Sequence, residues 1–261
     1  MLAILAATLR WSLLGFTLAF LLPVFAASLW WALQDRPDSW RNADWGPSGV
    51  LPPAQAVPGA AIRVMAARTG GAKGAVSVHS WIVHKRAGAA RWTRHDVVGW
   101  GRPVRRDAYA ADARWYSNLP QVIGAADGSA AATLIPRLEA AIAAYPFAGS
   151  DAYRIFPGPN SNTFTAHLLR ELPELGVTLP PHAVGRDFLG EGPQLVLDEG
   201  GDLHASISGL AGFTVGPRAG VELHLLGQAV GLDIMRPALK LPAIGRLGLS
   251  PRAQAAELPP G

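Results

Sequence analysis

The sequence predicts an α+β protein in which helices pack on a small antiparallel sheet, with an N-terminal transmembrane helix and a C-terminal β extension. Three observations support this prediction. Residues 11–33 are apolar and uncharged, short alternating segments precede two segments with apolar residues at helical spacing, and the chain beyond residue 180 is Gly-rich with short alternating runs.

The N-terminal apolar segment, residues 11–33, is long enough to cross a bilayer with some tilt. Trp11 at one end and Trp30 and Trp31 at the other would serve as interfacial anchors. The alternative is a cleaved signal peptide, with small residues at 26–28 near the cleavage point. An uncleaved anchor is favoured because the apolar run continues through Trp31 and exceeds a normal signal core. An N-terminal tail, residues 1–10, would precede the anchor.

The organisation after the anchor follows from composition and periodicity. Residues 34–60 are rich in Pro, Gly and small residues and predict a linker. The predicted α+β domain covers residues 61–190, and the β-rich extension covers residues 191–261. Strands are expected near residues 62–66, 75–83, 92–100, 153–156, 194–197, 203–207, 213–215 and 221–225, and helices over residues 129–145 and 161–172.

Composition excludes several classes of function. The formal charge of +4 with 16% charged residues is low for a protein that binds nucleic acid. The chain has no cysteine, so disulfides, thiolate metal sites and cysteine catalysis are excluded. The later histidines are scattered without metal-ligand spacing, at positions His167, His182, His204 and His224, and no Gly-rich phosphate loop is present. We therefore expect no metal and no cofactor.

The candidate catalytic residues are Ser161, His79 and Asp96. Ser161 follows a Pro turn at a predicted helix start, where free backbone N–H groups favour developing negative charge. His79 lies on an apolar strand and could act as base, and Asp96 lies on the neighbouring strand, from which it could orient the imidazole. The candidate binding residues around them are Asn160, Asn162, Trp81 and Trp100.

Each candidate also has a purely structural interpretation. Ser161, or Asn160 beside it, could be the N-cap of the helix. A single histidine on a strand, such as His79, is commonly a polar residue of the core or its rim. Asp96 could pair with Arg94 or Arg91 on the surface.

Four segments together resemble a bacterial family catalogued as domain of unknown function 3750, which carries an N-terminal membrane segment. They are His-Ser-Trp at 79–81, Val-Val-Gly-Trp at 97–100, Gly-Pro-Asn-Ser-Asn-Thr-Phe at 158–164 with Ala-His at 166–167, and Arg-Pro-Ala-Leu-Lys-Leu-Pro at 236–242. The resemblance covers nearly the whole chain. It implies a membrane protein but no particular activity.

A strand histidine followed later by an Asn-Ser helix start is also similar to the circularly permuted papain-like superfamily of NlpC type. This likeness implies a permuted papain-like fold, with His79 at the family's histidine, Ser161 at the position of its cysteine nucleophile, and Asp96 as the polar third member. Because a serine hydroxyl has a far higher pKa than a thiol, the substitution weakens the implied activity more than the implied fold.

These observations lead to three functional hypotheses for a single-pass protein of the bacterial inner membrane with a periplasmic domain. The first is a hydrolase or acyltransferase that acts through Ser161 and His79 on an amide or ester of the envelope. The second is a non-catalytic relative that binds a peptidoglycan or lipid fragment. The third is a structural or interaction protein in which Ser161 only caps the helix. The expected partners are the lipid bilayer, through residues 11–33, and such a fragment, with no nucleic acid.

Overall fold

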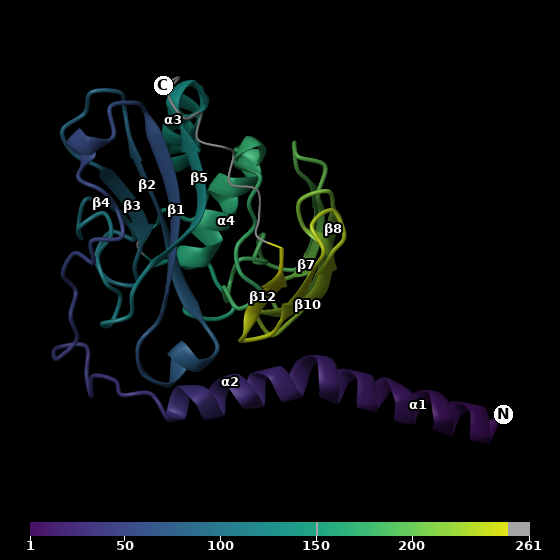
Figure 1. The fold of residues 1–261 in the computed structure, drawn as a ribbon. Helices are drawn as coiled ribbons and strands as arrows, with labels where there is room; N and C mark the ends of the chain where they lie inside the picture. The colour runs from purple at the N-terminus through teal and green to yellow at the C-terminus, as the bar shows by residue number, and fades with distance from the viewer. Residues whose placement is uncertain (150, 250–261) are drawn as a thin grey trace.

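Residues 1–149 and 151–249 are described by a computed structural model, in which two antiparallel sheets and an apolar N-terminal helix form an α+β architecture (Figure 1). The α+β class with antiparallel sheets is therefore confirmed. The five-stranded sheet and two helices form one part of the molecule, and the seven-stranded sheet lies on the other side of these helices.

The N-terminal helix is continuous from α1 (Leu2–Phe16) through a π-helical turn, η1 (Thr17–Leu21), into α2 (Leu22–Ala32). Pro23 causes the π turn, because it cannot donate a backbone hydrogen bond and its ring crowds the preceding turn. The helix widens there, and the N–H of Leu22 donates to the carbonyl of Thr17, five residues earlier. Ile4–Ala32 is long and apolar enough to cross a membrane. The helix begins at Leu2, so residues 2–10 of the predicted tail are helical as well.

The five-stranded sheet has the order β4-β3-β2-β1-β5, with every neighbouring pair antiparallel. The expected hairpin of the second and third predicted strands is present as β2 and β3. Two strands, β4 and β5, were not predicted, and residues 153–156 form no strand because prolines that cannot donate to a ladder follow them. The bounds are β1 (Ala61–Arg68), β2 (Val78–Lys85), β3 (Thr93–Val97), β4 (Val104–Arg106) and β5 (Gln121–Asp127).

Both faces of this sheet are covered. Helices α3 (Gly128–Ala143) and α4 (Ser161–Glu171) pack on one face, where Phe164 and Ile82 belong to the main core. On the other face, Trp81 and Trp115 form a second core together with Leu51. Leu51 belongs to the predicted linker, so this segment packs against the domain. Coverage of both faces explains why every residue of β2 is buried.

The seven-stranded sheet is an antiparallel meander in the order β12-β11-β10-β9-β8-β7-β6. The four strands expected in the C-terminal extension are present, and three further strands follow. The bounds are β6 (Pro193–Leu197), β7 (Leu203–Ile207), β8 (Ala211–Gly216), β9 (Gly220–Leu225), β10 (Gln228–Asp233), β11 (Ala238–Leu241) and β12 (Gly245–Gly248). Short 3-10 turns complete the structure: η2 (Ala54–Ala56), η3 (Gly71–Ala75) and η4 (Pro173–Leu175).

Candidate active site

A cleft of about 990 Å³ lies where the start of β2, the start of α4, a turn of the seven-stranded sheet and the N-terminal helix meet. Six of the seven predicted site residues are associated with it: five line it directly, and Asp96 contacts one of these, His79. The residues that define its character are Phe20, Val24, His79, Trp100, Trp115, Tyr153, Asn160, Ser161, Asn162 and Leu226.

His79 is held in a fixed orientation by two neighbours. Its Nε2 lies 3.3 Å from Oδ2 of Asp96, which is on the adjacent strand β3. Its ring stacks on Trp115 with centroids 3.6 Å apart and planes 4° from parallel. The other ring nitrogen, Nδ1, has no hydrogen-bond partner among the described residues and is not sealed from solvent. The imidazole is therefore anchored at one nitrogen and available at the other.

A buried arginine completes this arrangement. Arg94 donates a 2.7 Å hydrogen bond from Nη2 to the same Asp96 oxygen, and its guanidinium lies 4.1 Å from the ring centroid of Trp81. Both Arg94 and Asp96 are 1% exposed. The surface pairing of Asp96 with Arg94 that the sequence allowed is therefore a buried ion pair. The spacing of two residues, which places both side chains on one face of a strand, was the signal that Arg94 belongs to the site.

The electrostatics keep Asp96 ionised and His79 neutral. Burial acts to raise the pKa of Asp96, but the hydrogen bond from His79 and the charge of Arg94 outweigh it, so this pKa lies below its usual value. Burial lowers the pKa of His79 below 6.5, an effect that Asp96 only partly offsets and that Arg94 reinforces. A neutral imidazole oriented by a carboxylate is the form that a general base requires.

Asn160, and not Ser161, caps α4. Its Oδ1 accepts hydrogen bonds from the N–H groups of Asn162 and Thr163, and the Thr163 hydroxyl accepts one from the Asn160 N–H, which completes a capping box. The Asn160 amide also donates to the carbonyl oxygens of Ile155 and Val184. The interpretation of Ser161 as the cap is therefore wrong, because the neighbouring side chain already fills that role.

The close approach of Gly185 makes room for this cap. A Cβ at Gly185 would lie 2.3 Å from Nδ2 of Asn160, and the glycine has a φ of +93°. Only glycine tolerates both conditions. Asn162 ties the helix start to β2, because its amide donates to the Val78 carbonyl and its Oδ1 accepts from the Ser80 hydroxyl.

Ser161 is the first residue of α4 and lines the cleft. Its Oγ makes no hydrogen bond to any described residue, including His79. The two side chains reach the cleft from different directions: α4 packs on one face of the sheet, whereas His79 stacks with Trp115 on the opposite face. Both line the cleft because it lies at the start of β2, beside both faces of the sheet.

The two predicted tryptophans have different positions. Trp100 is 55% exposed and lines the cleft, so it can contact a ligand. Trp81 is fully buried under Arg94 and donates from Nε1 to the carbonyl of Ala111. The structure thus corrects its predicted role, from a binding residue to a support for the Arg94–Asp96 pair.

Replacing Asn160 with Ala is expected to lower the free energy of unfolding by about 1–2 kcal/mol, because the cap and the amide hydrogen bonds are lost together. Ser161→Ala is the matched control and should change stability by less than about 0.5 kcal/mol, since its hydroxyl has no partner among the described residues. Urea denaturation of the full chain in detergent measures both values. Equal losses in the two variants would show that the capping assignment is wrong.

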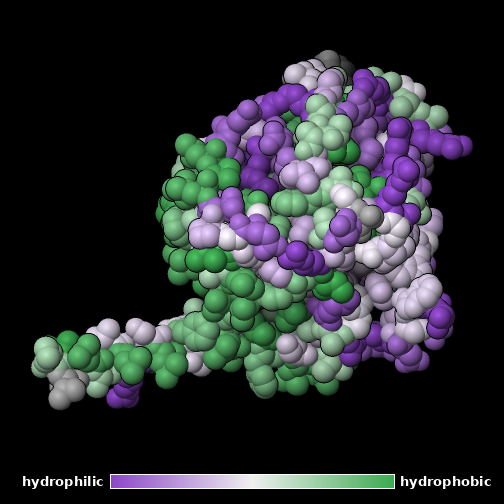
Figure 2. All heavy atoms as spheres, turned by 180° about the vertical axis from the view of Figure 1, so that it is seen from behind, coloured by the Kyte–Doolittle hydropathy of each residue, from purple (hydrophilic) through white to green (hydrophobic). Residues whose placement is uncertain are grey.

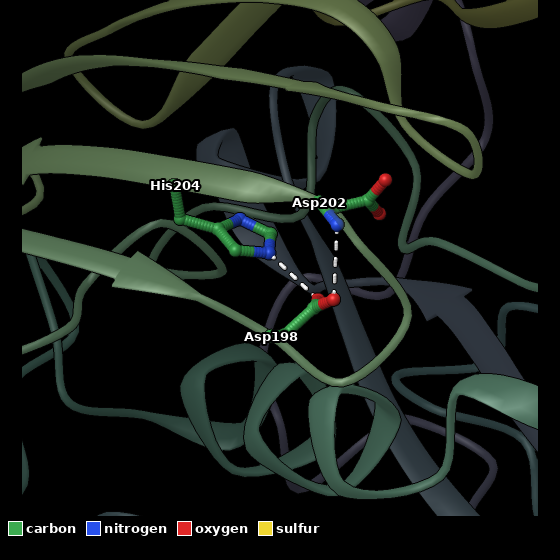
Figure 3. A group of neighbouring side chains, drawn as sticks. All are labelled: Asp198, Asp202 and His204. Atoms are coloured by element: carbon green, nitrogen blue, oxygen red, sulfur yellow. Dashed lines mark hydrogen bonds and ion pairs between the residues drawn. The ribbon is translucent and has the colours of Figure 1, made fainter.

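A second cluster lies in the seven-stranded sheet. Asp198, Asp202 and His204 have ligand atoms within 4.8 Å of one another, as a metal site requires (Figure 3). However, Asp198 Oδ2 already accepts from His204 Nε2 at 2.9 Å, and the Arg218 guanidinium contacts both carboxylates. A positive charge on Arg218 opposes a cation at the same place. The cluster is best described as an ion-pair network, and the absence of a metal stays a prediction.

The inner face of the seven-stranded sheet, which faces α4, is polar and charged. Glu222 is 1% exposed and contacts both Arg186 and Lys240. Nearby, neither carboxylate oxygen of Asp187 has a hydrogen-bond partner among the described residues, and burial raises the pKa of Asp187 to about 6. Arg186, Asp187 and Glu222 line a small cavity of about 50 Å³. Charge pairing, more than apolar packing, therefore joins this sheet to the rest of the molecule.

Fold and site together define an α+β domain with an anchored histidine and a helix N-terminus at one cleft, attached to an apolar helix. Residues 59–188 match the model of a family described as "Protein of unknown function (DUF3750)". This match supports the resemblance to an uncharacterised-domain family and includes His79, Asp96 and Ser161. The apolar helix and the seven-stranded sheet lie outside the matched range. No curated protein and no solved structure matches the chain.

Proposed function

We propose that this chain is a membrane-anchored protein of the bacterial envelope, of papain-like ancestry, that binds an amide or ester of an envelope component in its cleft and cleaves or transfers its acyl group. One observation carries the proposal: a neutral, carboxylate-anchored histidine and a helix-start serine with an unbonded hydroxyl line the same cleft.

In the proposed reaction, Ser161 Oγ attacks the carbonyl carbon while its proton passes to His79 Nδ1. Asp96 holds the opposite ring nitrogen and stabilises the imidazolium. The developing oxyanion would be stabilised by the N–H of Ser161, which has no partner among the described residues, because the Asn160 cap already engages the N–H groups of Asn162 and Thr163. The proton then moves from His79 to the leaving amine or alcohol, and water or an acceptor hydroxyl releases the acyl group from Ser161. A bound substrate would bring Ser161 and His79 within hydrogen-bond distance.

The apolar lining supports an acyl-bearing or otherwise lipid-linked ligand. Phe20 and Val24 reach the cleft from the N-terminal helix, and Ile155 and Phe156 line it from the loop before α4. A ligand delivered from the bilayer would meet this lining first. A lipid or peptidoglycan fragment of the periplasmic side of the inner membrane is the ligand class that we propose.

A non-catalytic binding protein is the second candidate. One observation favours it: Arg94 donates to the same Asp96 oxygen that contacts His79. The carboxylate charge is therefore shared between the guanidinium and the imidazole. In this case the cleft would retain its ligand without reacting.

The experiment is covalent labelling of the full chain in vesicles with a fluorophosphonate. Labelling is expected in the wild-type chain, with loss of at least about 100-fold in Ser161→Ala. Ser129→Ala is the matched control, because Ser129 is an exposed serine in the first turn of α3 with no histidine contact among the described residues. Labelling that persists in Ser161→Ala would contradict the catalytic proposal.

A thiol variant distinguishes two reasons for a lack of labelling: a cleft that is not reactive, and a probe that does not fit it. The chain has no cysteine, so Ser161→Cys carries a unique thiol. Alkylation by iodoacetamide at pH 7 is expected to be at least about 10-fold faster than in Ser129→Cys, because only residue 161 adds a histidine to the helix N-terminus. Equal rates would support the non-catalytic candidate.

A further inference from the structure

The seven-stranded sheet has inverted polarity. On its inner face lie His204, Thr214, Glu222, His224 and Lys240, all of them buried or half-buried. Its outer face carries no charged residue in any of the seven strands, and most of its large apolar side chains are exposed. A sheet with one solvated face normally shows the opposite pattern, apolar inside and polar outside.

The register aligns the outer apolar residues into a continuous row across the whole sheet. One residue from every strand takes part, and each is paired with the next: Leu197, Leu203, Val215, Val221, Leu232, Leu239 and Leu247. With strands spaced about 4.8 Å apart, this row is roughly 30 Å long. A second row lies beside it, with Leu195, Phe213 and Leu223. Exposed patches of this extent mark a binding surface.

The position of this outer face relative to the N-terminal helix indicates what covers the face. In Figure 1, α4 lies against the inner face and α1 projects beyond the sheet on the outer side, away from the five-stranded sheet. Figure 2 shows hydrophobic residues along the edge above the projecting helix and along the underside, whereas hydrophilic residues gather on the opposite edge. One apolar medium can therefore contact both α1 and the sheet.

The apolar surface is also continuous between the two. Leu226, in the turn between β9 and β10, is 57% exposed and lines the cleft together with Phe20 of the helix. At the other end of the strands, Ile234 and Met235 expose their side chains in the turn after β10. A second copy seated on the sheet would cover the sheet alone and not the exposed apolar residues of α1, such as Leu9 and Leu13. A bilayer covers all of them.

We propose that the outer face of the seven-stranded sheet rests on the lipid bilayer beside the N-terminal helix. This interaction is independent of whether the cleft is catalytic. It gives the protein a second membrane contact, and it places the cleft, which adjoins the sheet at Leu226, next to the bilayer surface.

The absence of native cysteine makes a direct test possible. Leu223→Cys places a unique thiol on the outer face, where residue 223 is 61% exposed and can change without disturbing the core. Ala140→Cys is the control, on an exposed position of α3 on the far side of the molecule from α1. Each full-length variant is labelled with NBD and reconstituted into phosphatidylcholine vesicles with a fraction of acyl-chain doxyl lipid.

We expect emission at position 223 to shift to the blue and to be quenched by doxyl lipid several times more strongly than at position 140. A second label, at Leu232→Cys, should behave like that at Leu223→Cys because it lies on the same face. Equal, weak quenching at all three positions in chains that float with the vesicles would overturn the proposal. Cross-linking of two copies through Cys at 223 without quenching would also overturn it, in favour of a dimer. Chains that fail to float would refute both this contact and the proposed anchor, whereas loss of fluorophosphonate labelling alone would leave the contact standing.

Discussion

Replacing Glu222 with Ala is expected to lower the free energy of unfolding by about 3–5 kcal/mol, among the largest effects of any single substitution in the chain. Glu222 is buried between Arg186 and Lys240, so its removal leaves two buried cations without a counter-charge. Burial acts to raise the pKa of Glu222, but Arg186 and Lys240 together lower it to about 2. The carboxylate is therefore ionised throughout the physiological range.

The pH dependence has a definite sign. A carboxyl group whose folded pKa is below its unfolded value near 4.5 contributes stability above pH 4.5 and loses it as pH falls toward 2. The wild-type chain should therefore lose stability over this window, and Glu222→Ala should lose less. Glu174→Ala is the control, because Glu174 forms an exposed ion pair with Arg137 and should contribute less than about 1 kcal/mol. Similar losses in both variants, measured by chemical denaturation in detergent, would contradict the importance of the buried network.

Asp96→Asn is expected to reduce both stability and reactivity. The substitution keeps the shape of the side chain but removes the charge opposite Arg94, which should cost about 3 kcal/mol because a buried guanidinium is left uncompensated. It also removes the group that orients His79 and raises its pKa, so labelling of Ser161 should slow by at least about 100-fold.

Two further variants separate these effects. Asp107→Asn is the control on the same hairpin: Asp107 is more exposed and accepts from the Arg94 backbone, a bond that Asn can also make. Replacing Arg94 with Met in the Asp96→Asn background should recover much of the stability, since an apolar side chain replaces the unpaired cation, but not the labelling. Recovery of labelling in the double variant would show that Asp96 does not position His79.

The sequence predicted the parts of the site that depend on local pattern. The hairpin that pairs the His79 and Asp96 strands followed from alternation, and the start of α4 followed from a Pro turn before polar and then apolar residues. The choice between Asn160 and Ser161 as the cap could not be made in advance. Both residue types are good caps, and only the backbone places the helix start between them.

Other features depended on tertiary contacts with no local signal. The cleft needs Phe20 from the N-terminal helix, and its distance in sequence from Ser161 gave no indication that the two would meet. The segment at 34–60 has the composition of a linker, yet Leu51 is buried with Trp81 and Trp115 because the far face of the sheet would otherwise be exposed. Among the three C-terminal strands that were not predicted, β12 contains two glycines in four residues, and glycine has a low propensity for strands.

The inverted polarity of the seven-stranded sheet has a consequence for how the chain folds. Neither of the two apolar cores includes a described residue of this sheet, so exclusion of water between the sheet and α4 gives it little driving force. Its strands pair only with their neighbours in the chain, which makes local pairing fast but leaves a bare leucine surface during synthesis. The N-terminal helix is synthesised before this sheet. If a bilayer covers the leucine surface, the helix can therefore bring the chain to the membrane before the sheet has formed. The order of segments in the chain would then protect the nascent protein from aggregation.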